Sequence, residues 1–320
     1  MFRRLFATAM SAALGLACAS AVWADYPEKP ITMIIGFNAG GGTDLAGRAL
    51  AAEMSDILGQ PIAVVNKPGA ASMIAAGEVS KALPDGYTLW FGSAGTYVTK
   101  EALGQAPTPY GDGLEIIGLS GTLVAALGVP KGSPLKSVED IIVAAKADPG
   151  ALRWAHNGVG AAFMAMGQGF VTANDLEVVG VPFKGAKGLR EALIANQVDF
   201  GVLNAGDRLR LGEDKFTVLS VIAADRAQVI DAELPTLTEQ GIPFVEIPSP
   251  VGLFAPGGVP QEVKDALGAA MKEATARDSF KDGMTKLFIP ASYLNASDAD
   301  AYVKQLQKNI KEILPKLRKK

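Results

Sequence analysis

The chain has a single cysteine, Cys18, and a single histidine, His156, among its 320 residues. Cys18 falls in an N-terminal stretch that we expect to be removed, which would leave the mature chain without a thiol. Disulfide bonds, cysteine-ligated metals and cysteine nucleophiles are then excluded. A metal site would need carboxylates with at most one imidazole, a weak ligand set for zinc, so we expect neither a metal nor a cofactor.

The chain also lacks an excess of positive charge. The formal net charge of −3 would become −5 once Arg3 and Arg4 leave with the N-terminal stretch. The only basic cluster, residues 316–320, fits a solvated helix end whose cations complement the helix dipole. A mildly acidic chain without a long basic run has no electrostatic basis for binding nucleic acid, and we expect no such partner.

One long apolar run is present, at the N-terminus. Arg3 and Arg4 precede it, no further charge occurs until Asp25, and small residues stand at its end. This pattern predicts a secretory signal peptide, residues 1–24, that is cleaved after Ala24. We therefore expect an exported, periplasmic protein.

Two other fates of this segment stay open. The uncharged run approaches the length that spans a bilayer, so a retained membrane anchor is one alternative. A lipoprotein is the other, because Cys18 follows Gly15-Leu16-Ala17. The usual lipobox, however, has leucine at the position of Gly15.

Strand-like apolar runs alternate with helical patterns along the chain, which predicts an α/β fold. The first series has strands and helices at residues 31–37, 45–58, 61–65, 72–81 and 87–91. The second series has strands at residues 123–129, 152–155, 178–183, 200–203, 216–223 and 250–255, with a helix capped by Ser137. Beyond Pro260 we predict helices, the last bent near Pro315 and striped by Tyr302, Leu306, Ile310, Ile313 and Leu317.

The mature chain, just under 300 residues, is too long for one core, so two domains are expected. We predict two α/β lobes joined by two extended crossings, near residues 123–129 and 250–255. Lobe 1 would comprise residues 25–124 and 250–320, and lobe 2 would comprise residues 125–249.

The loop from Phe37 to Asp44 is the first candidate for chemistry. In open α/β sheets, ligands bind beyond the carboxyl ends of the strands, at helix N-termini. Gly40, Gly41 and Gly42 let backbone N–H groups approach a ligand, and the following helix adds its positive end, so an anion is the natural guest. The loop lacks the Lys-Ser/Thr of a P-loop and the third glycine of a dinucleotide fingerprint. A flexible turn capped by Thr43 or Asp44 is the plainer alternative.

Four other loops follow strand ends, at residues 93–96, 154–161, 183–186 and 204–206. Ser93 could donate its hydroxyl to a carboxylate, although capping a helix is an equal alternative. His156 stands before a Gly-x-Gly turn, which raises the prospect of ligand contact above that of an ordinary structural histidine. The last two loops are plain turns unless something connects them to the others.

A series of motifs that runs through the chain in order supplies that connection: Tyr26-Pro27-x-Lys29-Pro30-Ile31, Gly40-Gly41-Gly42-Thr43-Asp44, Arg48, Leu58-Gly59-Gln60-Pro61, Val65-Asn66-Lys67-Pro68-Gly69-Ala70, Pro84-Asp85-Gly86-Tyr87-Thr88-Leu89, Val181-Pro182-Phe183-Lys184-Gly185-Ala186, Leu234-Pro235-Thr236-Leu237-x-Glu239-x-Gly241, Gly252-Leu253-x-Ala255-Pro256 and Val259-Pro260. The series resembles the receptors of tripartite tricarboxylate transporters, also called the Bug family. The resemblance covers essentially the whole mature chain.

The resemblance implies a two-lobed periplasmic binding protein, type II-like, with two hinge-crossing strands. Such a receptor closes over a small-molecule carboxylate and passes it to integral membrane permease subunits, and we expect a monomer. Backbone N–H groups and ordered water would hold the ligand carboxylate between the first loop and the Gly-x-Gly turn. Carried onto this sequence, the ligand-binding residues are Phe37, Asn38, Gly41, Gly42, Thr43, Asp44, Ser93, His156, Asn157, Val159, Gly160, Ala161 and Asn204. Residues 66–70 and 84–88 would be structural turns.

The chain departs from the family pattern at several positions. Ala161 stands where a hydroxyl residue is common, Met164-Ala165 where a His-Leu pair is common, and Asn204 where an acidic residue is often found. We expect a di- or tricarboxylate or an aromatic carboxylate, with His156 meeting a distal acidic group. Room for a larger or aromatic body would come from Phe37, Trp154, Phe163 and Met164.

Two functions other than transport are alternatives for this sequence. A periplasmic hydrolase would place His156 beside a serine nucleophile, but residues 92–95 lack the Gly-x-Ser-x-Gly spacing of a nucleophile elbow. We therefore predict no enzyme activity and no catalytic residue. A ligand-sensing receptor for a membrane sensor would use the same binding chemistry, so the sequence leaves that alternative open.

Overall fold

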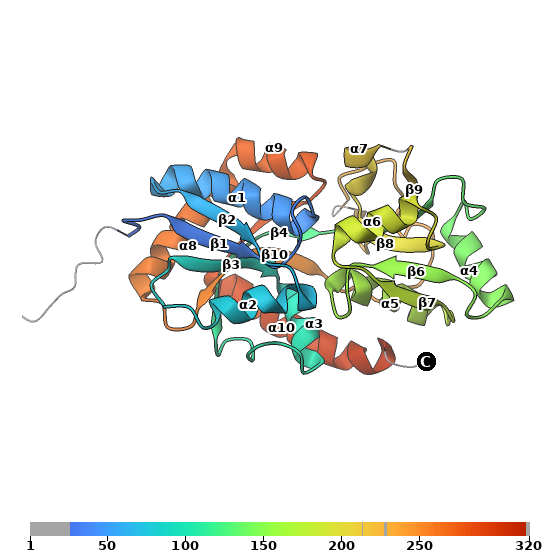
Figure 1. The fold of residues 1–320 in the computed structure, drawn as a ribbon, viewed down its shortest axis with the longest axis horizontal. Helices are drawn as coiled ribbons and strands as arrows, with labels where there is room; N and C mark the ends of the chain where they lie inside the picture. Colours follow the sequence, from blue (N-terminus) through green and yellow to red (C-terminus); the bar gives the residue numbers. More distant parts are fainter. Residues whose placement is uncertain (1–25, 213, 227–228, 318–320) are drawn as a thin grey trace, which may run out of the picture.

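The computed structural model describes residues 26–212, 214–226 and 229–317. Two sheets lie side by side, each covered by helices, and they form two lobes (Figure 1). This arrangement confirms the predicted α/β class with two lobes. The predicted signal peptide, with Cys18 and the cleavage point after Ala24, lies outside the described residues.

The lobe 1 sheet has six strands in the order β11-β4-β10-β3-β1-β2. Their bounds are β1 (Ile31–Ile35), β2 (Ile62–Asn66), β3 (Thr88–Ser93), β4 (Leu114–Leu123), β10 (Ser249–Pro256) and β11 (Ala291–Asn295). β1 runs parallel to β2 and β3, whereas β10 runs antiparallel to β3 and β4. The covering helices are α1 (Gly42–Leu58), α2 (Met73–Val79), α3 (Ala94–Ala102), α8 (Gln261–Ala276), α9 (Asp278–Lys286) and α10 (Ala296–Leu317). Because helices cover both faces, the central strands are buried along most of their length and consist largely of apolar residues.

The lobe 2 sheet has five strands in the order β7-β6-β8-β5-β9. Their bounds are β5 (Ala125–Pro130), β6 (Arg153–His156), β7 (Val179–Pro182), β8 (Phe200–Asn204) and β9 (Phe216–Ile222). The helices of this lobe are α4 (Val138–Ala147), α5 (Ala162–Ala173), α6 (Ala186–Ile194) and α7 (Asp207–Leu211). The predicted cap of α4 is confirmed, since Ser137 accepts a hydrogen bond from the Asp140 N–H and Asp140 accepts one in return.

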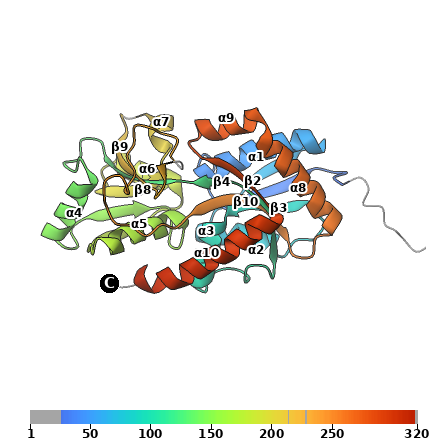
Figure 2. The same cartoon turned by 180° about the vertical axis from the view of Figure 1, so that it is seen from behind.

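The chain passes between the sheets twice. β4 ends at Leu123 and β5 begins at Ala125, so Val124 alone separates a strand of one sheet from a strand of the other. The second passage lies between β9 and β10. Helix α10 starts on lobe 1 and extends to α5 of lobe 2, as Figure 2 shows from behind. We propose that lobe 1 comprises residues 25–124 and 250–320 and that lobe 2 comprises residues 125–249.

Several predicted elements need correction. The strand expected at residues 123–129 is two strands, β4 and β5, and β4 begins at Leu114. The region after Pro260 is not wholly helical, because β11 interrupts it. Gly118 and Gly121 on β4 explain the close pairing, since a Cβ at either glycine would lie 2.8 Å from a backbone oxygen of the β11 segment. β11 itself has no long aliphatic run and is largely exposed, so its sequence gives little sign of a strand.

Within the described residues, no helix has both the length and the apolar character needed to cross a bilayer. Helix α10 continues past Pro315 to Leu317. Of its predicted stripe, Leu306 and Ile310 are buried and Tyr302 is partly exposed, while the side chains of Ile313 and Leu317 are not described.

Candidate functional site

The N-termini of three helices meet where the lobes face each other. Helix α1 starts at Gly42 on lobe 1, and helices α5 and α6 start at Ala162 and Ala186 on lobe 2. A small cavity of about 30 Å³ is lined by first-turn residues of all three helices: Gly42, Thr43, Phe163 and Ala186. The first N–H groups of a helix have no acceptor within it and carry the positive end of its dipole. The three helix N-termini therefore give this cavity an electrostatic environment that favours a negatively charged group.

Asp44 fixes the shape of the glycine loop. Its carboxylate accepts hydrogen bonds from Gly40 N at 2.8 Å, from Arg48 Nε at 3.0 Å and from Asn66 Nδ2 at 2.8 Å. Burial raises the pKa of Asp44, but these hydrogen bonds and the Arg48 charge outweigh burial, so the pKa lies below its usual value. Asp44 therefore stays ionised with its acceptors in use. Asp44 stabilises the loop but lines neither cleft cavity. The predicted contact between Asp44 and a ligand is therefore not supported.

A larger cavity of about 480 Å³ adjoins the small one, since Phe37, Asn38 and Asn157 line both. Lobe 1 contributes Gly36, Phe37, Asn38, Pro68, Gly69, Ala70, Ala71 and Lys100, and lobe 2 contributes Asn157, Gly158, Val159, Phe183, Lys184 and Gly185. Its volume lies within the range of small-molecule sites, about 300–1,000 Å³. The combined lining is apolar with a few polar groups from both lobes.

The turn expected at residues 66–70 also borders the larger cavity, because Pro68, Gly69, Ala70 and Ala71 line it. Ala70, Ala71 and Ser72 have φ values of 47°, 53° and 77°, so three consecutive non-glycine residues adopt the left-handed conformation. Such residues are strained and persist where packing holds them, often beside ligands. Here Ser72 Oγ accepts a hydrogen bond from Trp90 Nε1 at 3.1 Å, which ties the turn to strand β3.

Two asparagines place polar atoms at this site without a protein partner. Asn204 is buried, and its Oδ1 accepts a hydrogen bond from Gly206 N at 2.9 Å, while its Nδ2 has no partner among the described residues. The same Nδ2 lies 3.0 Å from the position of a Cβ on Gly42, so it faces the start of α1 across the lobes. Asn157 Oδ1 is also buried without a partner in the described part of the chain. A buried unpartnered donor or acceptor is costly, so both atoms suit contact with a ligand.

The lobes contact each other around these cavities. Asn38 Nδ2 donates to the Lys184 carbonyl oxygen at 2.8 Å, and Ala162 N donates to Thr96 Oγ1 at 3.1 Å. The Lys100 side chain of α3 packs against Gly160, where a Cβ would lie 2.8 Å from Lys100 Cε. The site is thus enclosed by side chains of both lobes.

The predicted site residues divide into two groups. Those that line a cavity are Phe37, Asn38, Gly41, Gly42, Thr43, Asn157, Val159 and Asn204. Those that line neither of the two cleft cavities are Asp44, Ser93, His156, Gly160 and Ala161. Ser93 Oγ accepts a hydrogen bond from Thr96 N at 3.1 Å and lies 2.9 Å from Ser249 Oγ, so it acts as the cap of α3. Gly160 and Ala161 shape the turn before α5.

His156 is buried in lobe 2 and lines neither cleft cavity. Its side chain is buried, its Nδ1 accepts a hydrogen bond from Gly158 N at 3.3 Å, and its ring lies 5.0 Å from that of Trp154. Burial lowers the pKa of His156 to about 4, against which the Gly158 hydrogen bond acts only weakly. The imidazole is therefore neutral at neutral pH. This position does not support the expected contact between His156 and a distal acidic group.

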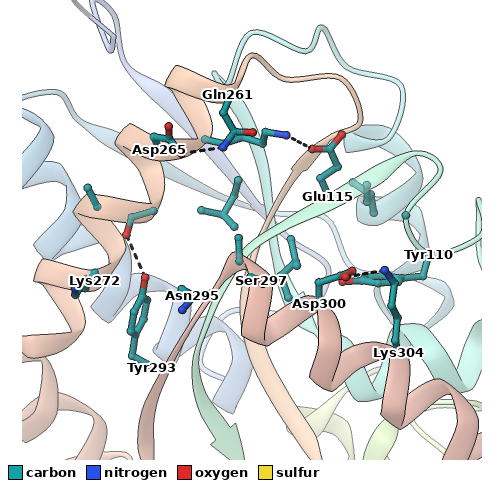
Figure 3. Close-up of a pocket in the computed structure, with 18 residues that line it drawn as sticks. Tyr110, Glu115, Gln261, Asp265, Lys272, Tyr293, Asn295, Ser297, Asp300 and Lys304 are labelled. Carbon is teal, nitrogen blue, oxygen red and sulfur yellow. Dashed lines mark hydrogen bonds and ion pairs between the residues drawn. The ribbon is translucent and has the colours of Figure 1, made fainter.

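A further cavity of about 680 Å³ lies on lobe 1, between α8, α10, β4 and β11 (Figure 3). Four of its charged groups form two ion pairs: Glu115 with Lys264 at 2.7 Å and Asp300 with Lys304 at 2.7 Å. Gln261 likewise donates to Asp265 at 2.8 Å. This cavity is larger than the cleft cavities, but all of its lining residues come from lobe 1, so it does not lie between the lobes.

Comparison with known proteins identifies the family. Residues 46–318 match the model of the tripartite tricarboxylate transporter family receptor. The chain belongs to this receptor family. A relative from Cupriavidus necator, the UPF0065 protein in the gbd 5′ region, is 32% identical over 311 residues, which cover 97% of this chain and 94% of the relative. The resemblance inferred from the motifs is confirmed.

Solved structures of family members have the same fold. The periplasmic binding protein BugD has a TM-score of 0.84 and 27% identity, with 91% of this chain and 98% of BugD covered. Rpa4515 of R. palustris, solved with adipate, has a TM-score of 0.84 and 25% identity over 92% of this chain and 98% of its own. MatC of Rhodopseudomonas palustris, with bound malate, has a TM-score of 0.79 and 27% identity over 92% of this chain and 100% of its own. The predicted periplasmic binding protein fold is confirmed.

Lys100, the segment at residues 68–71 and the loop at residues 183–186 line the cavities but were not among the predicted ligand-binding residues. Lys100 is four residues after Thr96 in α3, so the two share the helix face that meets lobe 2. A lysine on the buried face of a helix is the one signal that would have drawn attention to it. Nothing comparable distinguishes the 68–71 segment beyond its glycine and proline.

Proposed function

We propose that this receptor is periplasmic and captures a small organic carboxylate between its lobes for delivery to the permease subunits of a tripartite tricarboxylate-type transporter. The observation that supports this most is the meeting of three helix N-termini at one small cavity between the lobes. Desolvated backbone N–H groups bind a carboxylate through charge-assisted hydrogen bonds, which are stronger than neutral ones. Asn204 Nδ2 would add one further donor.

The adjoining cavity would hold the body of the ligand. Phe37, Phe183 and Val159 supply apolar surface on both sides of it. A short aliphatic chain or a single aromatic ring with one carboxylate in the small cavity fits this lining. The adipate and malate held by two related receptors are carboxylates of comparable size.

Capture and release would follow from a two-state equilibrium. A carboxylate that contacts α1 on one lobe and α5 and α6 on the other binds the closed form better than the open one, and so shifts the population toward closure. The permease would then recognise the closed surface. We propose binding without catalysis, because the described cavity lining contains backbone donors and amides but no nucleophile beside a base.

A thermal-shift screen followed by calorimetry tests the proposal. The mature protein, refolded and stripped of ligand, is screened against aliphatic, hydroxylated, amino and aromatic mono- and dicarboxylates, each beside its neutral amide. A ligand at a hundred times its Kd stabilises the folded state by about 2.7 kcal/mol, which raises Tm by a few degrees. We expect a shift with a carboxylate class and none with the amides.

Two matched variants place the binding in the cleft. Asn204→Leu removes the buried Nδ2 and should weaken carboxylate binding about tenfold, because one donor to an anion is lost. Asn309→Leu makes the same change on the exposed side of α10 and should leave affinity unchanged. Equal shifts with acids and amides, or no shift with any acid on folded protein, would refute the proposal.

A further inference from the structure

Lys100 carries the most unusual charge in the site. Its side chain is 5% exposed and lines the larger cavity. It reaches from α3 of lobe 1 to lobe 2, where its Nζ lies 3.0 Å from the position of a Cβ on Gly160. A lysine that is fully buried is rare in proteins unless it is paired.

The ammonium of Lys100 has a polar neighbour but no opposite charge. Its Nζ donates to Gln105 Oε1 at 2.8 Å, and no carboxylate in the described part of the chain forms an ion pair with it. An ammonium has three N–H donors, so a neutral amide oxygen uses one of them. Burial lowers the pKa of Lys100, and the neighbourhood supplies no anion that would raise it again.

This arrangement differs from the other lysines near the cleft. Lys184 lines the same cavity but is exposed, so water compensates its charge. Lys67 lies one residue before the lining segment and is paired with Glu78 at the protein surface. Burying an unpaired ammonium costs several kcal/mol in general, which a bound anion at the same place would offset.

We propose that Lys100 binds a second acidic group of the ligand, so that the receptor selects dianions over monoanions. This rests on the proposed function: one carboxylate occupies the small cavity at the three helix N-termini, and the second pairs with Lys100 in the larger cavity. Phe37 and Asn157 line both cavities and would flank the part of the ligand that joins the two groups. The ligand class is then a dicarboxylate with an apolar spacer.

The ligand-stripped wild-type protein is titrated calorimetrically with matched acids: adipate and hexanoate, suberate and octanoate, and terephthalate and benzoate. We expect the diacid of at least one pair to bind at least thirtyfold more tightly than its monoacid, the lower bound for losing one member of a buried charge pair. Lys100→Met keeps the apolar stem and should remove this preference, bringing the diacid within about threefold of the monoacid. Monoacid affinity should not fall.

Control variants keep the result interpretable. Lys146→Met removes an exposed cation of α4 that lines neither cleft cavity and should retain the diacid preference. Lys100→Gln serves as a second substitution if Lys100→Met does not fold, and Lys100→Arg should retain the preference because it retains the charge. Variant folding is checked by the unliganded Tm.

The two possible failures differ. Equal binding of diacids and monoacids by the wild type, or a diacid preference that survives Lys100→Met and Lys100→Gln, would overturn the role of Lys100 and leave carboxylate capture standing. Absence of binding by any of the six acids, and by the wider carboxylate screen, would overturn the proposed function and the role of Lys100 together.

Discussion

Replacing His156 with asparagine should make the stability of the protein less sensitive to acid. The pKa of His156 is about 4 in the folded chain, and its ordinary value is 6.5. Between these values the unfolded state binds more protons than the folded state, so wild-type stability falls as pH falls through this window. The full difference corresponds to about 3 kcal/mol, of which about 2 kcal/mol is lost between pH 7 and pH 5.

Asparagine suits this test because its side-chain oxygen can accept the Gly158 N–H that His156 Nδ1 now accepts, yet it does not titrate. Urea unfolding of both proteins at pH 7 and pH 5 gives the difference, and the carboxylates contribute equally to both. His156 is the only histidine, so one set of ring resonances reports its pKa directly. An NMR pKa near 6.5, or equal pH dependence of the two proteins, would refute the burial argument.

Three further predictions concern the cleft. Gly42→Ala should weaken carboxylate binding about tenfold, because the added Cβ would lie 3.0 Å from Asn204 Nδ2 and hold the lobes apart, while Tm stays level or rises. Asn38→Ala removes the 2.8 Å hydrogen bond to the Lys184 carbonyl and should lower affinity about two- to tenfold by calorimetry, with little change in unfolding. Asp44→Asn should lower the free energy of unfolding by about 1–3 kcal/mol in urea, since charge-assisted bonds to the glycine loop weaken, and an unchanged value would contradict its supporting role.

The loops of the site could be predicted because the sequence marks strand ends with glycine. The apolar run before Gly40, Gly41 and Gly42 predicts a strand that ends at this loop. Ligands bind at the carboxyl ends of strands in open α/β sheets, so the loop is predicted to lie at the site. Local pattern and topology were enough for this loop. Asn204 stands at the end of β8, but only the family resemblance connected its loop with the site.

The contributions of Lys100 and of His156 depended on packing, which the sequence does not express. His156 is the last residue of β6, close in sequence to the lining residues Asn157 and Val159, but its ring packs beside Trp154 and lines neither cavity. Lys100 lies in a helix where a lysine ordinarily extends into water, and α5 and the Gly160 turn bury it here. The packing of each side chain in the folded protein decides whether it lines a cavity.

β11 could not be found from the sequence for a related reason. A strand whose side chains are mostly exposed needs no alternation of apolar and polar residues. Its partner β4 supplies the condition for pairing instead, through Gly118 and Gly121, which leave space for the β11 backbone. The sequence feature that permits β11 to pair therefore lies in β4, about 170 residues earlier in the chain.

The same packing explains why ligand binding and lobe contact should be coupled. Asn157 Oδ1, Asn204 Nδ2 and the Lys100 ammonium lose water when the lobes meet, at about 1–3 kcal/mol for each neutral group and more for the charge. The bonds from Asn38 to Lys184 and from Ala162 to Thr96 return about 0.5–1.5 kcal/mol each, which is less than the three groups lose. We therefore expect closure without a ligand to be unfavourable. A ligand whose anionic groups accept from Asn204 Nδ2 and the Lys100 ammonium, and that has a donor for Asn157 Oδ1, would favour closure. On the proposed function, Asn204 and Lys100 would both bind the ligand and disfavour closure of the empty receptor.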